Sequence, residues 1–415
     1  MKNESLTEND EKKLGGIISS LKGNPIFRMS LGSKELFHSN FIEYLWYLDQ
    51  SAFIMMMNAL PSRQCNKLQR LKPRNDYRIG REEQNFDICI YHVNDKDKVI
   101  YDLVIENKVK SIPYKEQLKD YQTKANNTGC RFILLTLSQD FPDKGNEEIQ
   151  DWDIVGYDDL SPLINQYYLN GRKQNDPHYH YIKDYLSFIE KLCELKDYTL
   201  PAPQNLLSQQ LFDDTVIDAL KTIRLHDLYI KLRCSWFAMI LKKHFKDEAK
   251  VVHSFNDIEE GYVNLNVAIN QGNGQIAAWI CNEETDSNRP LKEKEKKLMN
   301  TFEIVIQGSQ YRHGINQARF LLDEDDKYKR LVGLYKRLEK LPDPRGLAFL
   351  NVSGAKQVRP YFQKKRIPKE GPYNCYGESY IYRYTEISDQ DTIERLLNRM
   401  MSDINEVLNN PPSLT

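Results

Sequence analysis

The sequence lacks the features that mark membrane, secreted and zinc-ribbon proteins. Its longest apolar runs, such as Ala52 to Met57, are too short to cross a bilayer, and the first twenty residues contain no apolar signal segment. Its seven cysteines are scattered singly, without a CxxC pair, which excludes a zinc ribbon and a disulfide framework. We therefore expect a cytoplasmic protein whose cysteines are mostly small buried side chains.

An excess of charge is also lacking, since 58 Lys and Arg residues face 59 Asp and Glu residues, for a net charge of −1. The protein therefore has no strong overall field for polyanions, and nucleic-acid binding would depend on local basic runs. One run extends from Arg63 to Arg81, and another, from Lys356 to Lys369, surrounds Tyr361 and Phe362. Solvated surfaces carry similar runs, so both interpretations stay open. Five residues of these runs are predicted nucleic-acid contacts: Arg74, Arg78, Arg81, Lys364 and Arg366.

The length of 415 residues and a hydrophobic fraction of 40% favour two globular domains. Residues 1–24 are polar and charged, with one weak amphipathic stretch that predicts a loosely held helix. Residues 25–197 form the first expected domain, and 198–210, which contains Pro201 and Pro203, reads as a linker. Residues 211–415 are expected to form an α+β domain with a mainly antiparallel sheet, which begins with a long helix over about 213–245.

Within the first domain, the hydrophobic periodicity alternates between helix and strand. A helix is predicted from Ser33 and a strand around Phe86 to Tyr91, followed by a polar turn and a second strand over 99–109. Later predicted elements are a helix from Pro113 to about Ala125, strands at 131–137 and 152–155, and a helix from about 181 to 195. This order predicts an α/β fold with a mixed sheet flanked by helices.

Three charged residues of the predicted hairpin carry the proposed chemistry. Glu106 and Lys108 are two residues apart on one strand, so their side chains share a sheet face, and Asp87 lies on the neighbouring strand. Burying them among Val and Ile is costly unless something compensates. A Mg²⁺ ion, or Mn²⁺ in its place, bound by Asp87 and Glu106 would do so, with the Ile105 carbonyl as a possible third ligand. Lys108 would then orient or deprotonate the attacking water.

These residues resemble a known family. Phe86-Asp87-Ile88, Ile105-Glu106-Asn107-Lys108 and Gln117-Leu118-Lys119-Asp120-Tyr121 look like the D, E-x-K and Q-x-x-x-Y elements of the PD-(D/E)XK nuclease superfamily. The stretch from Glu35 to Trp46 is similar to the first helix of an uncharacterised prokaryotic branch. The resemblance covers roughly residues 30–165.

The resemblance implies a restriction-endonuclease-like core that hydrolyses nucleic acid, with DNA favoured, in defence or DNA processing. It implies catalytic roles for Asp87, Glu106, Lys108 and Gln117, and metal binding by Asp87, Glu106 and Glu35. Tyr121 joins the predicted nucleic-acid contacts. Members of the superfamily often dimerise to cut two strands, and the sequence leaves a homodimer open.

Other interpretations compete with this one. A Glu and a Lys on one strand face often form a simple ion pair, Glu35 could be a plain first-turn acid, and Gln117 and Tyr121 need no special role. His38 and the His178-Tyr179-His180 stretch are interpreted as structural, because Mg²⁺ prefers oxygen ligands. The main alternative is a catalytically inactive nuclease-fold module that binds nucleic acid or protein. A further alternative places the main activity in the second half of the chain.

Overall fold

The computed structural model describes residues 8–30, 35–62, 70–109, 115–125, 129–137, 151–200, 207–233, 236–237, 252–253, 261–270, 275–282, 302–307, 310–316, 374–376, 380–387 and 391–409. The chain divides into two compact units, Met1–Pro201 with Asp214–Leu232, and Ala202–Asp213 with Arg233–Thr415. Asp214–Leu232 thus joins the first unit, whereas the sequence-based division at 198–210 assigned it to the second. That division remains a proposal.

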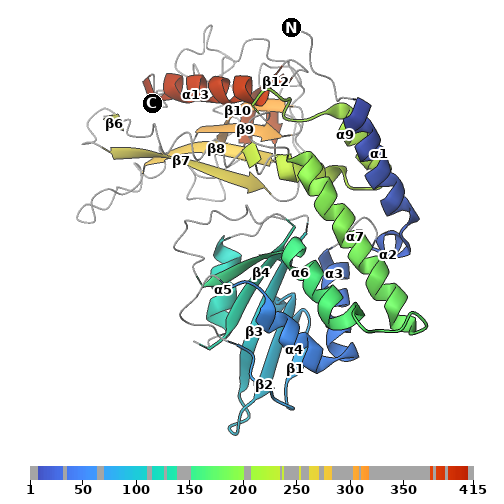
Figure 1. Ribbon diagram of the computed structural model, residues 1–415. Coiled ribbons are helices and arrows are strands. Elements are labelled where there is room, and N and C mark those ends of the chain that lie inside the picture. Colours follow the sequence, from blue (N-terminus) through green and yellow to red (C-terminus); the bar gives the residue numbers. More distant parts are fainter. Residues whose placement is uncertain are drawn as a thin grey trace. The chain divides into compact units, whose positions relative to one another are not determined.

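A five-stranded mixed sheet forms the centre of the first unit (Figure 1). Its strands lie in the order β1-β2-β3-β4-β5; β1 and β2 pair antiparallel, as do β2 and β3, whereas β4 is parallel to both β3 and β5. The strands are β1 (Arg78–Gly80), β2 (Ile88–Val93), β3 (Val99–Lys108), β4 (Arg131–Thr136) and β5 (Trp152–Gly156). The predicted hairpin and mixed sheet are confirmed.

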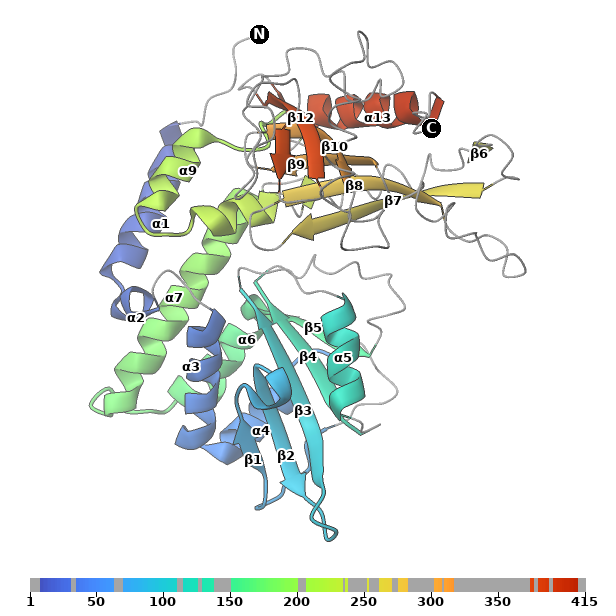
Figure 2. The same ribbon diagram turned by 180° about the vertical axis from the view of Figure 1, so that it is seen from behind.

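Helices cover both faces of this sheet, as Figure 2 shows from behind. The face that carries Val104, Phe132 and Trp152 packs against Leu118 of α5, while α3 contacts β3 and α6 contacts β5. The described helices of this unit include α1 (Glu8–Gly23), α2 (Pro25–Met29), α3 (Glu35–Leu48), α4 (Gln50–Ala59), α5 (Lys115–Ala125), α6 (Tyr157–Ile164), η3 (Asn165–Leu169), α7 (Pro177–Thr199) and α9 (Asp214–Lys221).

The N-terminal segment is more firmly packed than its polar composition predicts. Leu14, Ile17 and Leu21 are buried, and α1 contacts α7. Their spacing of three and four residues puts all three side chains on one helix face, which supplies an apolar stripe in an otherwise charged helix. The prediction of a loosely held helix was therefore wrong.

The second unit contains a seven-stranded antiparallel sheet in the order β11-β12-β10-β9-β8-β7-β6. Its strands are β6 (Val252–His253), β7 (Gly261–Asn270), β8 (Gln275–Asn282), β9 (Phe302–Gln307), β10 (Gln310–Asn316), β11 (Asn374–Tyr376) and β12 (Tyr380–Glu386), and its described helices include α13 (Ile393–Asn409). The predicted antiparallel sheet is confirmed among the described strands.

Some expectations differ from the structure or fall outside it. The helix predicted over 213–245 is interrupted, because α9 ends at Lys221 and Arg224 adopts a left-handed conformation with φ +60°. The helix predicted over 181–195 is longer, and α7 includes Tyr198 and Thr199. The basic residues Lys364 and Arg366 lie outside the described residues. None of the described helices has the length and apolar character needed to span a membrane.

Candidate active site

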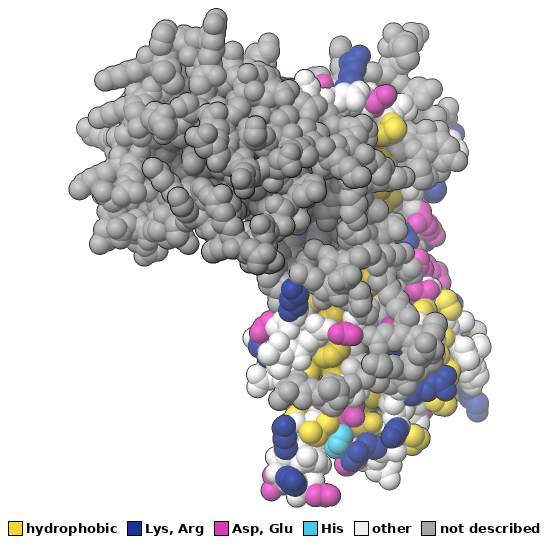
Figure 3. Space-filling model, turned by 90° about the vertical axis from the view of Figure 1, so that its left-hand side faces the viewer, with side chains coloured by type: hydrophobic (Ala, Val, Ile, Leu, Met, Phe, Trp, Pro, Cys, Tyr) yellow, Lys and Arg dark blue, Asp and Glu magenta, His cyan; other side chains and the backbone are white. Residues whose placement is uncertain are grey.

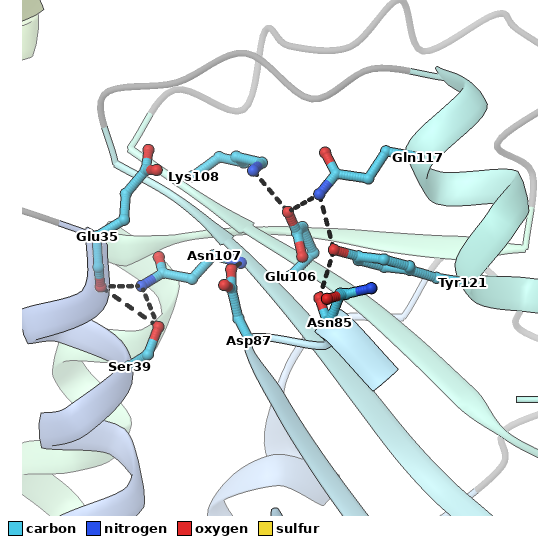
Figure 4. Close-up of polar contacts among 9 residues, drawn as sticks. All are labelled: Glu35, Ser39, Asn85, Asp87, Glu106, Asn107, Lys108, Gln117 and Tyr121. Carbon is cyan, nitrogen blue, oxygen red and sulfur yellow. Dashed lines mark hydrogen bonds and ion pairs between the residues drawn. The ribbon is translucent and has the colours of Figure 1, made fainter. Parts of the chain in front are cut away.

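The candidate site lies where β2 begins and β3 ends, beside α5 (Figure 4). Ile88 pairs with Ile105 across the hairpin, and one further step of this register puts Asp87, just before β2, opposite Glu106. Alternation along β3 then sends Glu106 and Lys108 to the α5 face and Asn107 to the opposite face. The sequence prediction that Glu106 and Lys108 share a face agrees with this arrangement.

Glu106 is nearly fully buried, and its two carboxylate oxygens have different surroundings. Its Oε1 accepts from Lys108 Nζ at 2.6 Å and from Gln117 Nε2 at 2.9 Å. Its Oε2 is buried and has no hydrogen-bond partner among the described residues. A buried carboxylate oxygen without a partner is costly, so the site is electrostatically incomplete as it stands.

The acids of the site oppose one another's ionisation. Burial, followed by the charge of Asp87, raises the pKa of Glu106 to about 7, although Lys108 works against this shift. Burial also raises the pKa of Asp87, against the backbone N–H of Asn107. For Lys108, burial acts to lower the pKa, but Glu106 outweighs it and the pKa is raised. Lys108 is therefore cationic at neutral pH.

Asn107, the residue between Glu106 and Lys108, connects the site to two helices. Its backbone N–H donates to Asp87 Oδ2 at 2.7 Å. On the other sheet face its Nδ2 donates to the Glu35 carbonyl at 3.2 Å and to Ser39 Oγ at 3.1 Å, while Tyr157 donates to its Oδ1 at 2.8 Å. No role was predicted for Asn107, although an amide side chain on the strand face that carries Leu103 and Ile105 is a signal of buried hydrogen-bond partners.

Gln117 and Tyr121 lie one turn apart on α5 and point toward the carboxylates (Figure 4). Gln117 Nε2 donates to Glu106 Oε1 and also to the Tyr121 hydroxyl at 2.8 Å. Tyr121 in turn donates to the Asn85 carbonyl at 2.6 Å and is only 4% exposed. The prediction that Tyr121 contacts nucleic acid is therefore corrected, because its ring and hydroxyl group are both engaged inside the protein.

Glu35 lies at the site, and metal binding by its side chain stays a prediction. Its carbonyl accepts from Asn107, and its charge raises the pKa values of Asp87 and Glu106 as a lesser contribution. No group of three or more His, Cys, Asp or Glu side chains that could hold a metal ion occurs in the described part of the chain. His38, on the next turn of α3, is fully buried with its Nδ1 3.1 Å from the Tyr185 hydroxyl.

The basic run before β2 is partly engaged within the protein. Arg74 forms an ion pair with Asp76 at 2.9 Å, and Arg81 forms one with Glu43 at 3.5 Å. Arg78 is exposed at the start of β1. Figure 3 shows basic and acidic side chains interspersed on the described part of one face. Arg74 and Arg78 are thus both exposed, whereas Arg81 is half-buried.

The donors at the site fit a divalent cation that prefers oxygen. Mg²⁺ commonly uses one or two protein carboxylates and completes its shell with water and phosphate oxygens. Glu106 Oε2 is a buried carboxylate oxygen without a partner in the described structure, and Asp87 lies opposite. A cation there would compensate for the burial of both acids.

Comparison with known proteins agrees with this geometry. Residues 26–187 match the family model described as PD-(D/E)XK nuclease superfamily. This segment belongs to that superfamily. The mixed sheet flanked by helices is the restriction-endonuclease-like fold that the resemblance implied, and we refer to the segment as the nuclease domain. No curated protein and no solved structure matches the chain.

Proposed function

We propose that the nuclease domain is a metal-dependent enzyme that hydrolyses phosphodiester bonds of nucleic acid, with DNA as the favoured substrate. Asp87 and Glu106 would hold Mg²⁺, and Lys108 and Gln117 would act beside them. The observation that carries the proposal is the buried Glu106 Oε2, which lacks a described partner while Lys108 and Gln117 both bind Oε1. A buried charge arranged in this way is typical of functional sites.

Each residue of the candidate site would contribute to hydrolysis in a different way. Gln117 and Lys108 hold the Glu106 carboxylate in one orientation, which leaves the buried Oε2 without a described donor. The Asn107 N–H orients Asp87 in the same way. The raised pKa of Lys108 favours a cationic role, in which its ammonium group stabilises the negative charge that develops on the phosphate, over a role as general base. When bound, Mg²⁺ supplies Lewis-acid polarisation of the phosphate and activation of a water nucleophile.

The proposal is tested with the full-length protein and a panel of single- and double-stranded DNA and RNA. Cleavage is measured with Mg²⁺, with Mn²⁺ and with a chelator. We expect metal-dependent cleavage by the natural protein and a loss of about 10²- to 10³-fold or more in Asp87→Asn, Glu106→Gln and Lys108→Met. Asp120→Asn is the matched acid-to-amide control, since Asp120 is exposed on α5 and pairs with Lys124.

Three outcomes contradict the proposal. Full metal-dependent cleavage by Asp87→Asn and Lys108→Met would place the activity elsewhere, and a variant lacking the nuclease domain that still cleaves would assign it to the second unit. No cleavage of any substrate, together with binding that weakens steeply with salt, would favour the inactive nucleic-acid-binding module.

A further inference from the structure

A strained turn leads directly into the candidate site. Glu82, Gln84 and Asn85 have φ values of +57°, +54° and +68°, and they account for three of the five non-glycine residues with positive φ in the described chain. Asn tolerates this left-handed conformation better than most residues, but Glu and Gln avoid it. Strain of this kind persists only where surrounding contacts enforce it, and it is common at functional sites. Asp87 follows this turn by two residues.

Contacts from three directions hold the turn. Phe86, immediately after it, is fully buried, with its ring edge-on to Tyr101 at 5.2 Å and to Tyr121 at 5.1 Å. The Glu83 carboxylate sits against Gly80, where an added Cβ would lie 2.5 Å from it. The third contact is the hydrogen bond from Tyr121 to the carbonyl of Asn85, a residue of the turn itself.

The last of these contacts belongs to a closed ring that contains both carboxylates (Figure 4). From the Asn85 carbonyl, hydrogen bonds pass through the Tyr121 hydroxyl and Gln117 Nε2 to Glu106 Oε1. The chain then leads from Glu106 to Asn107, whose N–H donates to Asp87 Oδ2. Two peptide bonds return from Asp87 to Asn85. The separation of the two acids therefore depends on the conformation of the turn.

We infer that Tyr121 is a positioning residue, whose hydroxyl group holds the strained turn at 82–85 and thereby keeps Asp87 beside Glu106. This inference rests on the proposed function for its consequence, which is binding of a divalent cation between the two acids. The role differs from contact with water, phosphate or nucleic acid, since the hydroxyl group is buried and directed at the backbone.

The test uses Tyr121→Phe in the full-length protein, because this change removes the hydroxyl group and keeps the ring that packs against Phe86. The first measurement is hydrogen exchange, without metal, in peptides that cover 82–87. We expect exchange to be faster by about tenfold, which corresponds to the loss of one hydrogen bond. The second measurement is the affinity for Mn²⁺ by calorimetry, with an expected rise in Kd of about tenfold. Tyr168→Phe, which removes a buried hydroxyl group that donates to the carbonyls of Leu45 and Asp49, is the matched control and should change neither quantity.

Glycine at position 84 provides a second test that a merely structural role would not satisfy. Glycine adopts positive φ without strain, so Gln84→Gly should make the turn less dependent on its tether. The double variant Tyr121→Phe/Gln84→Gly should recover most of the lost Mn²⁺ affinity, whereas Gln84→Gly alone should leave the affinity near that of the natural protein. If Tyr121→Phe alone does not fold, the double variant should fold and bind Mn²⁺.

The outcomes separate this inference from the proposed function. Unchanged hydrogen exchange at 82–87 in Tyr121→Phe, no recovery in the double variant, or a double variant that is also unfolded would each overturn the positioning role. A natural protein that binds no Mn²⁺ would overturn the proposed function, and hydrogen exchange would still decide whether Tyr121 holds the turn.

Discussion

Two buried ion pairs in the same sheet differ in how completely they are compensated. Arg131 on β4 donates from Nε to Asp153 at 2.8 Å and from its other nitrogens to the carbonyls of Met57, Leu60 and Pro61. Ser62 donates to the other Asp153 oxygen at 2.9 Å. In the second pair, Glu106 with Lys108, both described partners of Glu106 bind Oε1, and Oε2 has none in the described structure.

The difference teaches how a structural pair is distinguished from a functional one. Arg131 and Asp153 fasten the end of α4 to the sheet, and each contact satisfies a group that would otherwise be unpaired in the interior. At Glu106 one buried oxygen has no described partner, and the pKa of the carboxyl group is raised to about 7. Such a cost in stability is expected where a ligand supplies the missing interaction.

The largest expected effect comes from replacing the Glu106–Lys108 pair with apolar residues. Glu106→Leu/Lys108→Met should abolish metal-dependent cleavage, by about 10³-fold or more. Its stability in urea without metal should be unchanged or higher by about 1–4 kcal/mol, since a poorly compensated buried pair adds little. A large loss of stability in this variant would show that the pair is structural.

Breaking the other pair should have the opposite result. Arg131→Met leaves Asp153 buried without its cation, and the free energy of unfolding should fall by about 3–5 kcal/mol. Cleavage measured at a temperature where the variant is folded should stay near that of the natural protein. Urea unfolding and a cleavage assay at low temperature check both parts, and a folded but inactive variant would contradict the distinction.

The pH dependence of stability sharpens the comparison. The pKa of Glu106 is raised from 4.5 to about 7, so its contribution to stability is fully present below pH 4.5 and is lost as the pH rises through about 7. Asp87 is shifted in the same direction. Urea unfolding with a chelator should therefore show lower stability at pH 8 than at pH 5.5, and this difference should shrink in Glu106→Gln. Mg²⁺ should restore stability at pH 8, and a larger pH difference in Glu106→Gln would contradict this account.

The smallest effect is expected at the edge of the structural pair. Ser62→Ala removes the hydrogen bond to Asp153 and should lower the free energy of unfolding by about 1 kcal/mol, without a change in cleavage. Thermal unfolding and the cleavage assay measure the two quantities. A loss of unfolding free energy as large as that of Arg131→Met would mean that the buried Asp153 depends on the Ser62 hydroxyl as much as on Arg131.

Periodicity predicted the parts of the fold that depend on local pattern. The alternation around Ile88 and the Val- and Ile-rich stretch over 99–109 were sufficient for the hairpin, and the two-residue spacing of Glu106 and Lys108 was sufficient for their shared face. The pattern also gave β4, β5 and α5 nearly correct bounds. It missed β1, which is only three residues long, and it missed α13, although Ile393, Leu396, Leu397 and Met400 recur there at helical spacing.

The rest of the site depends on contacts between distant residues. The partners of Asn107 come from α3 and α6, 68 and 50 residues away. The conformational preferences of Glu and Gln do not predict a left-handed backbone at Glu82 or Gln84, because tertiary contacts impose this conformation. The pairing of Arg81 with Glu43 and the burial of Tyr121 likewise arise only in the folded chain.

Asn107 has a consequence for how such sites are recognised and redesigned. The middle position of E-x-K is usually written as any residue. Here it is Asn107, whose fully buried amide group donates to the Glu35 carbonyl and accepts from the Tyr157 hydroxyl. Neither Asp nor Leu offers that combination. A search pattern that accepts any residue at this position would thus admit sequences that cannot form the hydrogen bonds between the end of β3 and its two neighbouring helices. A site transferred to another protein would need α3 and α6 along with its three charged residues.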